Sequence, residues 1–183
     1  MVLLKTPEVN LGWIAEDFEL LGTDGKFYNL AATSGSRGLV VVFMCNHCPY
    51  VQTMVAKIVK DAEELKPCGI NFIGINPNDA TQYPQDSYEM MQKFVITNKI
   101  PFPYVVDQTQ EIARKYDAVC TPDFFGFNAE LKLQYRGRLG GTRQDSTLDT
   151  ERELFTAMLE IAKKSEYHGT QHPSIGCSIK WKS

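Results

Sequence analysis

An apolar segment from Gly38 to Met44 is the most distinct feature of the hydrophobic pattern, and it leads directly into Cys45. Its β-branched residues do not alternate with polar ones, which is typical of a central strand covered on both faces. After Pro49, which suits a first helical turn, apolar residues recur at helical spacing as far as Leu65. The pattern predicts a buried strand and an amphipathic helix, with Cys45 at the carboxyl end of the strand.

A second strand completes a βαβ unit. Pro67 and Gly69 end the helix, and the apolar run from Ile70 to Ile75 follows them. A right-handed crossover makes the two strands parallel. Because a loop at the carboxyl end of a strand lies on the same rim as Cys45, residues 77–100 are a candidate partner-recognition insertion.

The remaining elements are shorter. Asp24-Gly25, between apolar residues, predicts a hairpin over Asp17 to Leu30. The other predicted elements are a helix near 88–95, a strand at 104–106, a helix at 110–116, a hairpin over 122–136 and a last helix starting at Thr150. There Thr150 and Glu153 form a capping box. The tail from Tyr167 shows no clear period.

This order of elements predicts an α/β fold with a mixed central β-sheet flanked by helices. An N-terminal β-hairpin (about 10–31) precedes the core (about 38–165), and a C-terminal tail (166–183) follows it. We expect residues 1–183 to form one domain, since this length suffices to bury a core without disulfides.

Composition and charge exclude several classes of protein. Hydrophobic residues make up 43% of the 183 positions and charged residues 22%, the usual balance for a soluble globular domain. The net charge of −3 and the lack of a basic run argue against nucleic-acid and membrane partners. No secretion signal and no membrane-spanning stretch is recognisable. We therefore expect a soluble cytoplasmic protein.

Five cysteines form an odd set, in which only Cys45 and Cys48 are close in sequence. This argues against a secreted disulfide framework and, in a reducing compartment, indicates chemistry or metal binding. The position of Cys45-Asn46-His47-Cys48-Pro49 between a buried strand and an amphipathic helix makes the C-x-x-C signal specific. Amide groups at a helix start stabilise a thiolate, so the pKa of Cys45 is expected well below about 8.5.

This arrangement predicts thiol-disulfide exchange. Cys45, as the more exposed sulfur, is the expected nucleophile, and Cys48, one helical turn on, is the expected resolving cysteine. As an imidazolium, His47 would stabilise the reduced thiolate and make the disulfide a stronger oxidant. The expected partners are protein or small-molecule thiols and disulfides, and no bound organic cofactor or metal is needed.

The segment from Gly12 to Leu30 resembles the entry segment of the alkyl hydroperoxide reductase and thiol-specific antioxidant family, through Asp17-Phe18-Glu19-Leu20 and Asp24-Gly25-Lys26. From Val40 to Arg138 the chain resembles the thioredoxin-like branch that carries C-x-x-C. The resemblance implies a thioredoxin-like fold. It also implies that the Thr121–Pro122 bond is cis, that Pro122 faces the cysteine pair, and that the Thr121 backbone binds a substrate peptide by β-augmentation.

A thiol peroxidase is the alternative enzyme, with peroxide as its substrate. Peroxiredoxins carry threonine or serine three residues before the peroxidatic cysteine, and here Cys45 holds that place relative to Cys48, which departs from the family pattern. In this alternative Cys48 reacts with peroxide, and Cys45 or Cys120 is the resolving cysteine. Arg136 and Arg138 could supply a guanidinium, but a strand-end arginine is more often solvated or ion-paired, so neither is assigned.

The other cysteines leave alternatives open. Cys120, two residues before Pro122, either approaches the pair or is a small buried apolar residue. Cys177, in the tail, is either a third redox cysteine or a docked packing residue. Cys68, at a helix end, is expected to be structural or simply free.

A metal-binding or redox-sensing module without turnover is a rival of another class. Cys45, Cys48, Cys177 and His172 would supply zinc ligands if the tail reached the helix start. Zinc sites usually bring two close cysteine pairs, and this sequence has one, so no metal is expected.

Overall fold

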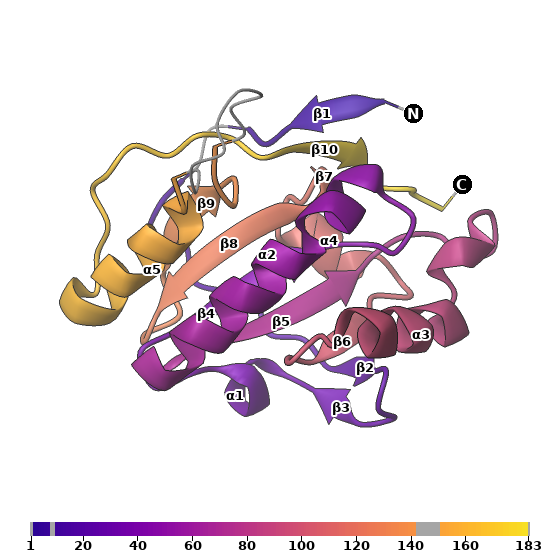
Figure 1. The fold of residues 1–183 in the computed structure, drawn as a ribbon, viewed down its shortest axis with the longest axis horizontal. Helices are drawn as coiled ribbons and strands as arrows, with labels where there is room; N and C mark the ends of the chain where they lie inside the picture. The colour runs from indigo at the N-terminus through magenta and orange to yellow at the C-terminus, as the bar shows by residue number, and fades with distance from the viewer. Residues whose placement is uncertain (1, 8–9, 142–150, 183) are drawn as a thin grey trace.

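A computed structural model describes residues 2–7, 10–141 and 151–182 and contains a seven-stranded mixed sheet (Figure 1). In spatial order its strands are β3 (Phe27–Tyr28), β2 (Leu20–Gly22), β6 (Tyr104–Val106), β5 (Ile70–Asn76), β4 (Gly38–Phe43), β8 (Asp123–Asn128) and β9 (Leu133–Gly137). Strands β4, β5 and β6 run parallel, and the other pairs are antiparallel. The two predicted hairpins and the predicted βαβ unit are therefore confirmed.

Helices cover both faces of this sheet, as predicted. The helices are α1 (Leu30–Thr33), α2 (Pro49–Leu65), α3 (Tyr88–Asn98), α4 (Glu111–Lys115) and α5 (Glu153–Lys164), with 3₁₀ turns η1 (Lys66–Cys68) and η2 (Pro84–Asp86). Every residue of β4 is buried. Val40 and Val42 face the core under α2, α3 and α5, whereas Leu39 and Val41 face α1 and α4. Two covered faces explain why the strand is continuously apolar.

A second, three-stranded sheet joins distant parts of the chain. It has the order β1 (Leu3–Lys5), β10 (Ile175–Ser178) and β7 (Cys120–Thr121), all antiparallel. Figure 1 shows β10 between β1 and β7, beside the first turn of α2. The tail is thus docked as a strand, which its irregular sequence pattern did not predict.

Helix ends agree with the sequence where the structure describes them. Pro49 is the first residue of α2, and Cys48 is its N-cap. Within the described residues α5 begins at Glu153 after Arg152, whereas the predicted start at Thr150 lies outside the described residues.

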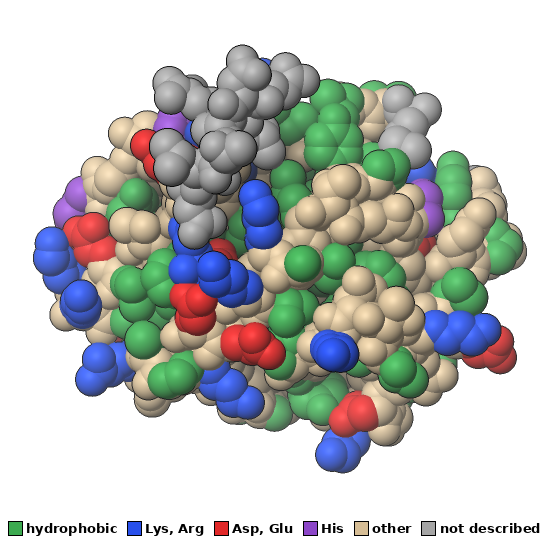
Figure 2. Space-filling view, in the orientation of Figure 1, with side chains coloured by type: hydrophobic (Ala, Val, Ile, Leu, Met, Phe, Trp, Pro, Cys, Tyr) green, Lys and Arg blue, Asp and Glu red, His purple; other side chains and the backbone are tan. Residues whose placement is uncertain are grey.

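The surface and helix lengths give two further facts. On the face formed by α2, α3 and α5, Figure 2 shows basic and acidic side chains interspersed. Among the described residues, no helix combines the length and the apolar character needed to cross a bilayer.

Candidate functional site

The two cysteines of the motif meet at one residue of strand β7. Cys45 follows β4 and is 1% exposed, and Cys48 is fully buried. The Cys45 sulfur lies 3.4 Å from Thr121 Oγ1, and the Cys48 thiol donates to the Thr121 carbonyl oxygen at 3.1 Å. The Thr121–Pro122 bond is cis, as the resemblance implies. The fold therefore places both sulfurs against the residue that precedes Pro122.

The arrangement favours a negative charge on Cys48. Against the effect of burial, the hydrogen bond from the Cys45 thiol and, to a smaller extent, the Cys177 thiol and the Val51 amide together lower the pKa of Cys48 to about 4. The same hydrogen bond raises the pKa of Cys45, as do burial and the Asp86 carboxylate. The expectation that Cys45 has the low pKa is wrong for this arrangement, because Cys48 is the N-cap of α2 and receives the hydrogen bonds that lower a thiol pKa.

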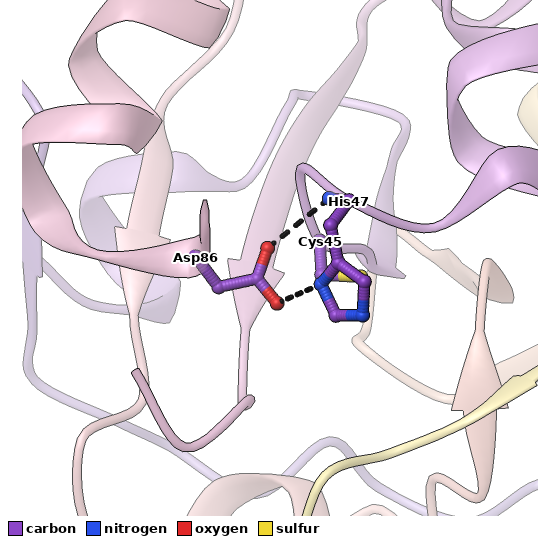
Figure 3. A group of neighbouring side chains, drawn as sticks. All are labelled: Cys45, His47 and Asp86. Atoms are coloured by element: carbon purple, nitrogen blue, oxygen red, sulfur yellow. Dashed lines mark hydrogen bonds and ion pairs between the residues drawn. The ribbon is translucent and has the colours of Figure 1, made fainter. Parts of the chain in front are cut away.

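His47 is paired with a buried carboxylate. Its Nδ1 lies 2.6 Å from Oδ2 of Asp86 (Figure 3). Its ring stacks on Tyr83 with centroids 5.4 Å apart. The sulfur of Cys45, a ring nitrogen of His47 and an Asp86 oxygen lie within 4.8 Å of one another. An imidazolium here would face a carboxylate of opposite charge, so the two groups act on Cys45 with opposite signs.

Asp86 also holds the backbone of the motif. Its Oδ1 accepts from the amides of Asn46 and His47 at 2.8 and 3.2 Å, and its Oδ2 accepts from Asn78 Nδ2 at 2.7 Å. No sequence motif singles out this residue. Its only signal was membership of the polar segment after β5, which was expected on the same rim as Cys45.

The tail brings a third sulfur to the pair. The Sγ atoms of Cys177 and Cys48 are 3.1 Å apart, and Cys177 pairs with Thr121 across β10 and β7. The Thr121 edge, which was predicted to bind substrate peptide, is thus occupied by the chain itself. Cys120 is fully buried and its thiol donates to the Pro122 carbonyl oxygen at 3.7 Å.

Both unassigned arginines are ion-paired. Arg136 is 5% exposed, donates to Asp123 Oδ2 at 3.0 Å and lies over the ring of Phe125. Arg138 donates to Glu153 at 2.8 Å through its Nε. Both therefore match the interpretation that a strand-end arginine is ion-paired.

Of the zinc ligands considered from the sequence, the three cysteines lie together at Thr121, but His172 has another partner. His172 Nδ1 lies 3.0 Å from Glu153 Oε2, so this ring is engaged by α5. A different group of potential ligands, Cys45, His47 and Asp86, lies together. Within that group the Asp86 oxygens already accept hydrogen bonds from backbone amides and from Asn78. In the described structure Asp86 therefore orders the backbone of the motif.

Comparisons with known proteins agree with the fold. Residues 11–136 match the model of the AhpC/TSA family. An uncharacterized conserved protein from Geobacillus kaustophilus is similar with a TM-score of 0.92 and 40% identity, covering 100% of this chain and 97% of that one. A hypothetical protein from Sinorhizobium meliloti gives a TM-score of 0.90 and 34% identity, covering 98% of each chain.

A structure with lower sequence identity is named as a redox protein. The thioredoxin domain of a thiol-disulfide oxidoreductase from Bacteroides vulgatus gives a TM-score of 0.60 and 17% identity, covering 70% of this chain and 89% of that one. This likeness confirms the thioredoxin-like fold predicted from the sequence. A search among curated proteins gave no match.

Proposed function

Since the chain belongs to the AhpC/TSA family, we propose that it is a thiol-disulfide oxidoreductase in which Cys45 attacks a substrate disulfide and Cys48 resolves the product. One observation carries this proposal: Cys45 and Cys48 lie at the start of α2 with both sulfurs against Thr121, the residue before the cis Pro122. The pKa shifts of opposite direction on the two thiols agree with it. Two coupled thiols at the start of a helix can exchange a proton and then a disulfide bond.

The first step forms a mixed disulfide. Cys45 passes its proton to the Cys48 thiolate along their hydrogen bond, and the Cys45 sulfur attacks one sulfur of the substrate disulfide. A Cys45–substrate bond forms, the substrate disulfide breaks, and the other half leaves as a thiolate. The Cys48 proton then passes to solvent or to this leaving group.

The second step releases the substrate. The Cys48 thiolate attacks Cys45 Sγ, so the Cys45–Cys48 disulfide forms and the second substrate thiol leaves. Two electrons have moved from the protein to the substrate, and the reverse sequence oxidises a dithiol. Once Cys45 is bound to substrate it no longer donates to Cys48, but the Cys177 thiol and the Val51 amide still lower the pKa of Cys48 and so favour a thiolate as the resolving sulfur.

Protein or small-molecule disulfides are the proposed substrates. Thr121, before Pro122, is the proposed substrate-binding residue, because its backbone and hydroxyl contact both sulfurs. Both cysteines are buried in the described structure. A protein substrate can therefore reach the two cysteines only if strand β10 moves away from Thr121, whereas a small disulfide requires a smaller opening.

Turnover with matched variants tests the proposal. Dithiothreitol would supply electrons, with insulin and a small aromatic disulfide as separate substrates. We expect the protein to accelerate the reduction of at least one of them, Cys45→Ser and Cys48→Ser to lose the acceleration, and Cys68→Ser to retain it. A rate that stays at the uncatalysed value for both substrates would reject the proposal.

A thiol peroxidase is the second candidate, because Cys48 is the sulfur with the lowered pKa. Its thiolate would take an oxygen atom from a peroxide, giving a sulfenic acid and an alcohol or water. Cys45 would then condense with the sulfenic acid to give the disulfide and water. Peroxide turnover that is lost in Cys48→Ser and kept in Cys45→Ser with added thiol would support this candidate over the first.

A further inference from the structure

The strand β10 lies where the proposed function would seat a substrate peptide. Cys177 is in register with Thr121, and Ser178 with Cys120. The other edge of β10 is covered by β1. Strand β10 therefore places Cys177 beside Thr121, the residue that contacts both Cys45 and Cys48.

A glycine allows the strand to come this close. A Cβ atom at Gly176 would overlap the Thr121 carbonyl oxygen, so only glycine fits this step of the strand. The next residue, Cys177, is 2% exposed and its Sγ lies 3.1 Å from Cys48 Sγ. A disulfide needs about 2.05 Å between sulfurs, so the two atoms have to approach by only about 1 Å.

Contacts on both sides of β10 fix this position. Ser174 donates through its amide to Thr6 Oγ1 at 3.0 Å and through its hydroxyl to the Gly137 carbonyl at 2.8 Å. On the other side, the Lys180 amide donates to Asn78 Oδ1 at 2.9 Å. Hydrogen bonds on both sides of Cys177 therefore hold it beside Cys48.

We propose that Cys177 is a third redox thiol, which exchanges with Cys48 and takes over the disulfide formed by Cys45 and Cys48. The proposal rests on the proposed function, which forms that disulfide. The Cys177 thiol loses its proton and attacks Cys48 Sγ, the Cys48–Cys177 bond forms and the Cys45–Cys48 bond breaks. Cys45 leaves with the electron pair and takes up a proton, so the step needs no outside oxidant or reductant.

The charges around Cys177 agree with this order of events. Burial, followed by the hydrogen bond and charge of Cys48, raises the pKa of Cys177 to about 12, and Lys180 opposes this. Bonding Cys48 to Cys45 removes the charge on Cys48. Cys177 therefore ionises more readily when a disulfide is present for it to attack.

Cys120 provides a contrast on the same edge. Its thiol points to the Pro122 carbonyl, and burial with the Asp123 charge raises its pKa. It has the burial of Cys177 and a place in the paired strand, but its sulfur faces a carbonyl oxygen. Cys120→Ser is therefore the matched control.

Disulfide mapping in Cys45→Ser tests the proposal. The variant and the wild type would be equilibrated with oxidised and reduced glutathione, quenched with acid, alkylated, digested and analysed by mass spectrometry. We expect Cys48–Cys177 to be the main disulfide of Cys45→Ser and of Cys45→Ser/Cys120→Ser. In Cys45→Ser/Cys177→Ser this disulfide is absent, and glutathione adducts accumulate at Cys48.

The wild type keeps the test independent of how well the variants fold. At partial oxidation it should contain Cys48–Cys177 beside Cys45–Cys48, and Cys177→Ser should contain only the latter. Absence of Cys48–Cys177 from wild type and from Cys45→Ser, in buffers that form Cys45–Cys48, overturns this inference and leaves the proposed function intact. Absence of Cys45–Cys48 from wild type and from Cys177→Ser rejects the proposed function instead.

Discussion

Nδ1 of His47 lies 2.6 Å from Oδ2 of Asp86, and the other oxygen of the same carboxylate accepts from the His47 backbone amide. One carboxylate thus fixes both the ring and the backbone of the residue between the two cysteines. Asp86 is fully buried at its side chain, so this control operates without competition from water.

Replacing this carboxylate by an amide should weaken the fold and change the chemistry. In Asp86→Asn the charge-assisted hydrogen bonds to Asn46, His47 and Asn78 are lost or weakened, and we expect a loss of about 2 kcal/mol in the free energy of unfolding. Removing the negative charge of Asp86, which lies beside Cys45, also stabilises the thiolate charge of the reduced Cys45–Cys48 pair, so the reduction potential should become less negative. Urea unfolding and redox titration measure the two effects. The exposed Glu63→Gln on α2 is the control, and an unchanged potential in Asp86→Asn would contradict this role.

The lowered pKa of Cys48 predicts a pH dependence of stability. The folded pKa, about 4, is below the unfolded value, so the unfolded state binds more protons between them and stability rises with pH in that window. The contribution is complete above about pH 8.5 and is lost as pH falls through about 4. Between about pH 6 and 8 the reduced wild type should gain up to about 1.4 kcal/mol per pH unit more than Cys48→Ser. Equal slopes in urea unfolding would contradict the shift.

The buried ion pair between β8 and β9 should be structural. Asp123 and Arg136 are 3.0 Å apart and nearly inaccessible to solvent. Arg136→Met leaves the Asp123 carboxylate without its partner and should cost about 3–5 kcal/mol, whereas Asp123→Leu/Arg136→Met should cost less. Turnover per folded molecule should stay unchanged. A large loss of peroxide turnover in a fully folded Arg136 variant would instead assign this arginine to a peroxidase.

Gly176 offers a way to loosen the tail. In Gly176→Ala the new methyl group would collide with the Thr121 carbonyl oxygen, so β10 should move away from β7. We expect faster alkylation of Cys45 and Cys48 and faster reduction of protein disulfides. Ile175→Ala, at the exposed neighbouring position, is the control. If alkylation rates in Gly176→Ala equal those of wild type, β10 does not limit access.

Much of the main sheet could be predicted because its signals are local. The apolar run before Cys45, Pro49 at the helix start and Asp24-Gly25 in a turn each determine structure within a few residues. The position of the cysteine pair at the strand–helix junction follows from the same signals. The cis Thr121–Pro122 bond could be predicted only from the resemblance to the thioredoxin-like branch.

The other parts of the site depend on long-range contacts that a local pattern does not contain. Cys177 reaches Cys48 across 129 positions, and Asp86 reaches His47 across 39. Strand β10 has four residues, and Gly176 lowers its strand propensity, so its pairing comes from the edges of β1 and β7. The predicted pKa order of Cys45 and Cys48 was wrong because the burial of the two thiols and the position of Cys177 could not be inferred from the sequence.

Redox titration with disulfide mapping tests the central claim most directly. Wild type would be equilibrated in glutathione buffers, acid-quenched and alkylated, and the fraction of Cys45–Cys48 disulfide followed by mass spectrometry. We predict a reversible two-electron couple that persists in Cys177→Ser and is absent from Cys48→Ser, with a midpoint of about −270 mV for a reductase or about −120 mV for an oxidant. If Cys45 and Cys48 remain separately alkylated across the whole range, the two are not a redox pair and the account is wrong.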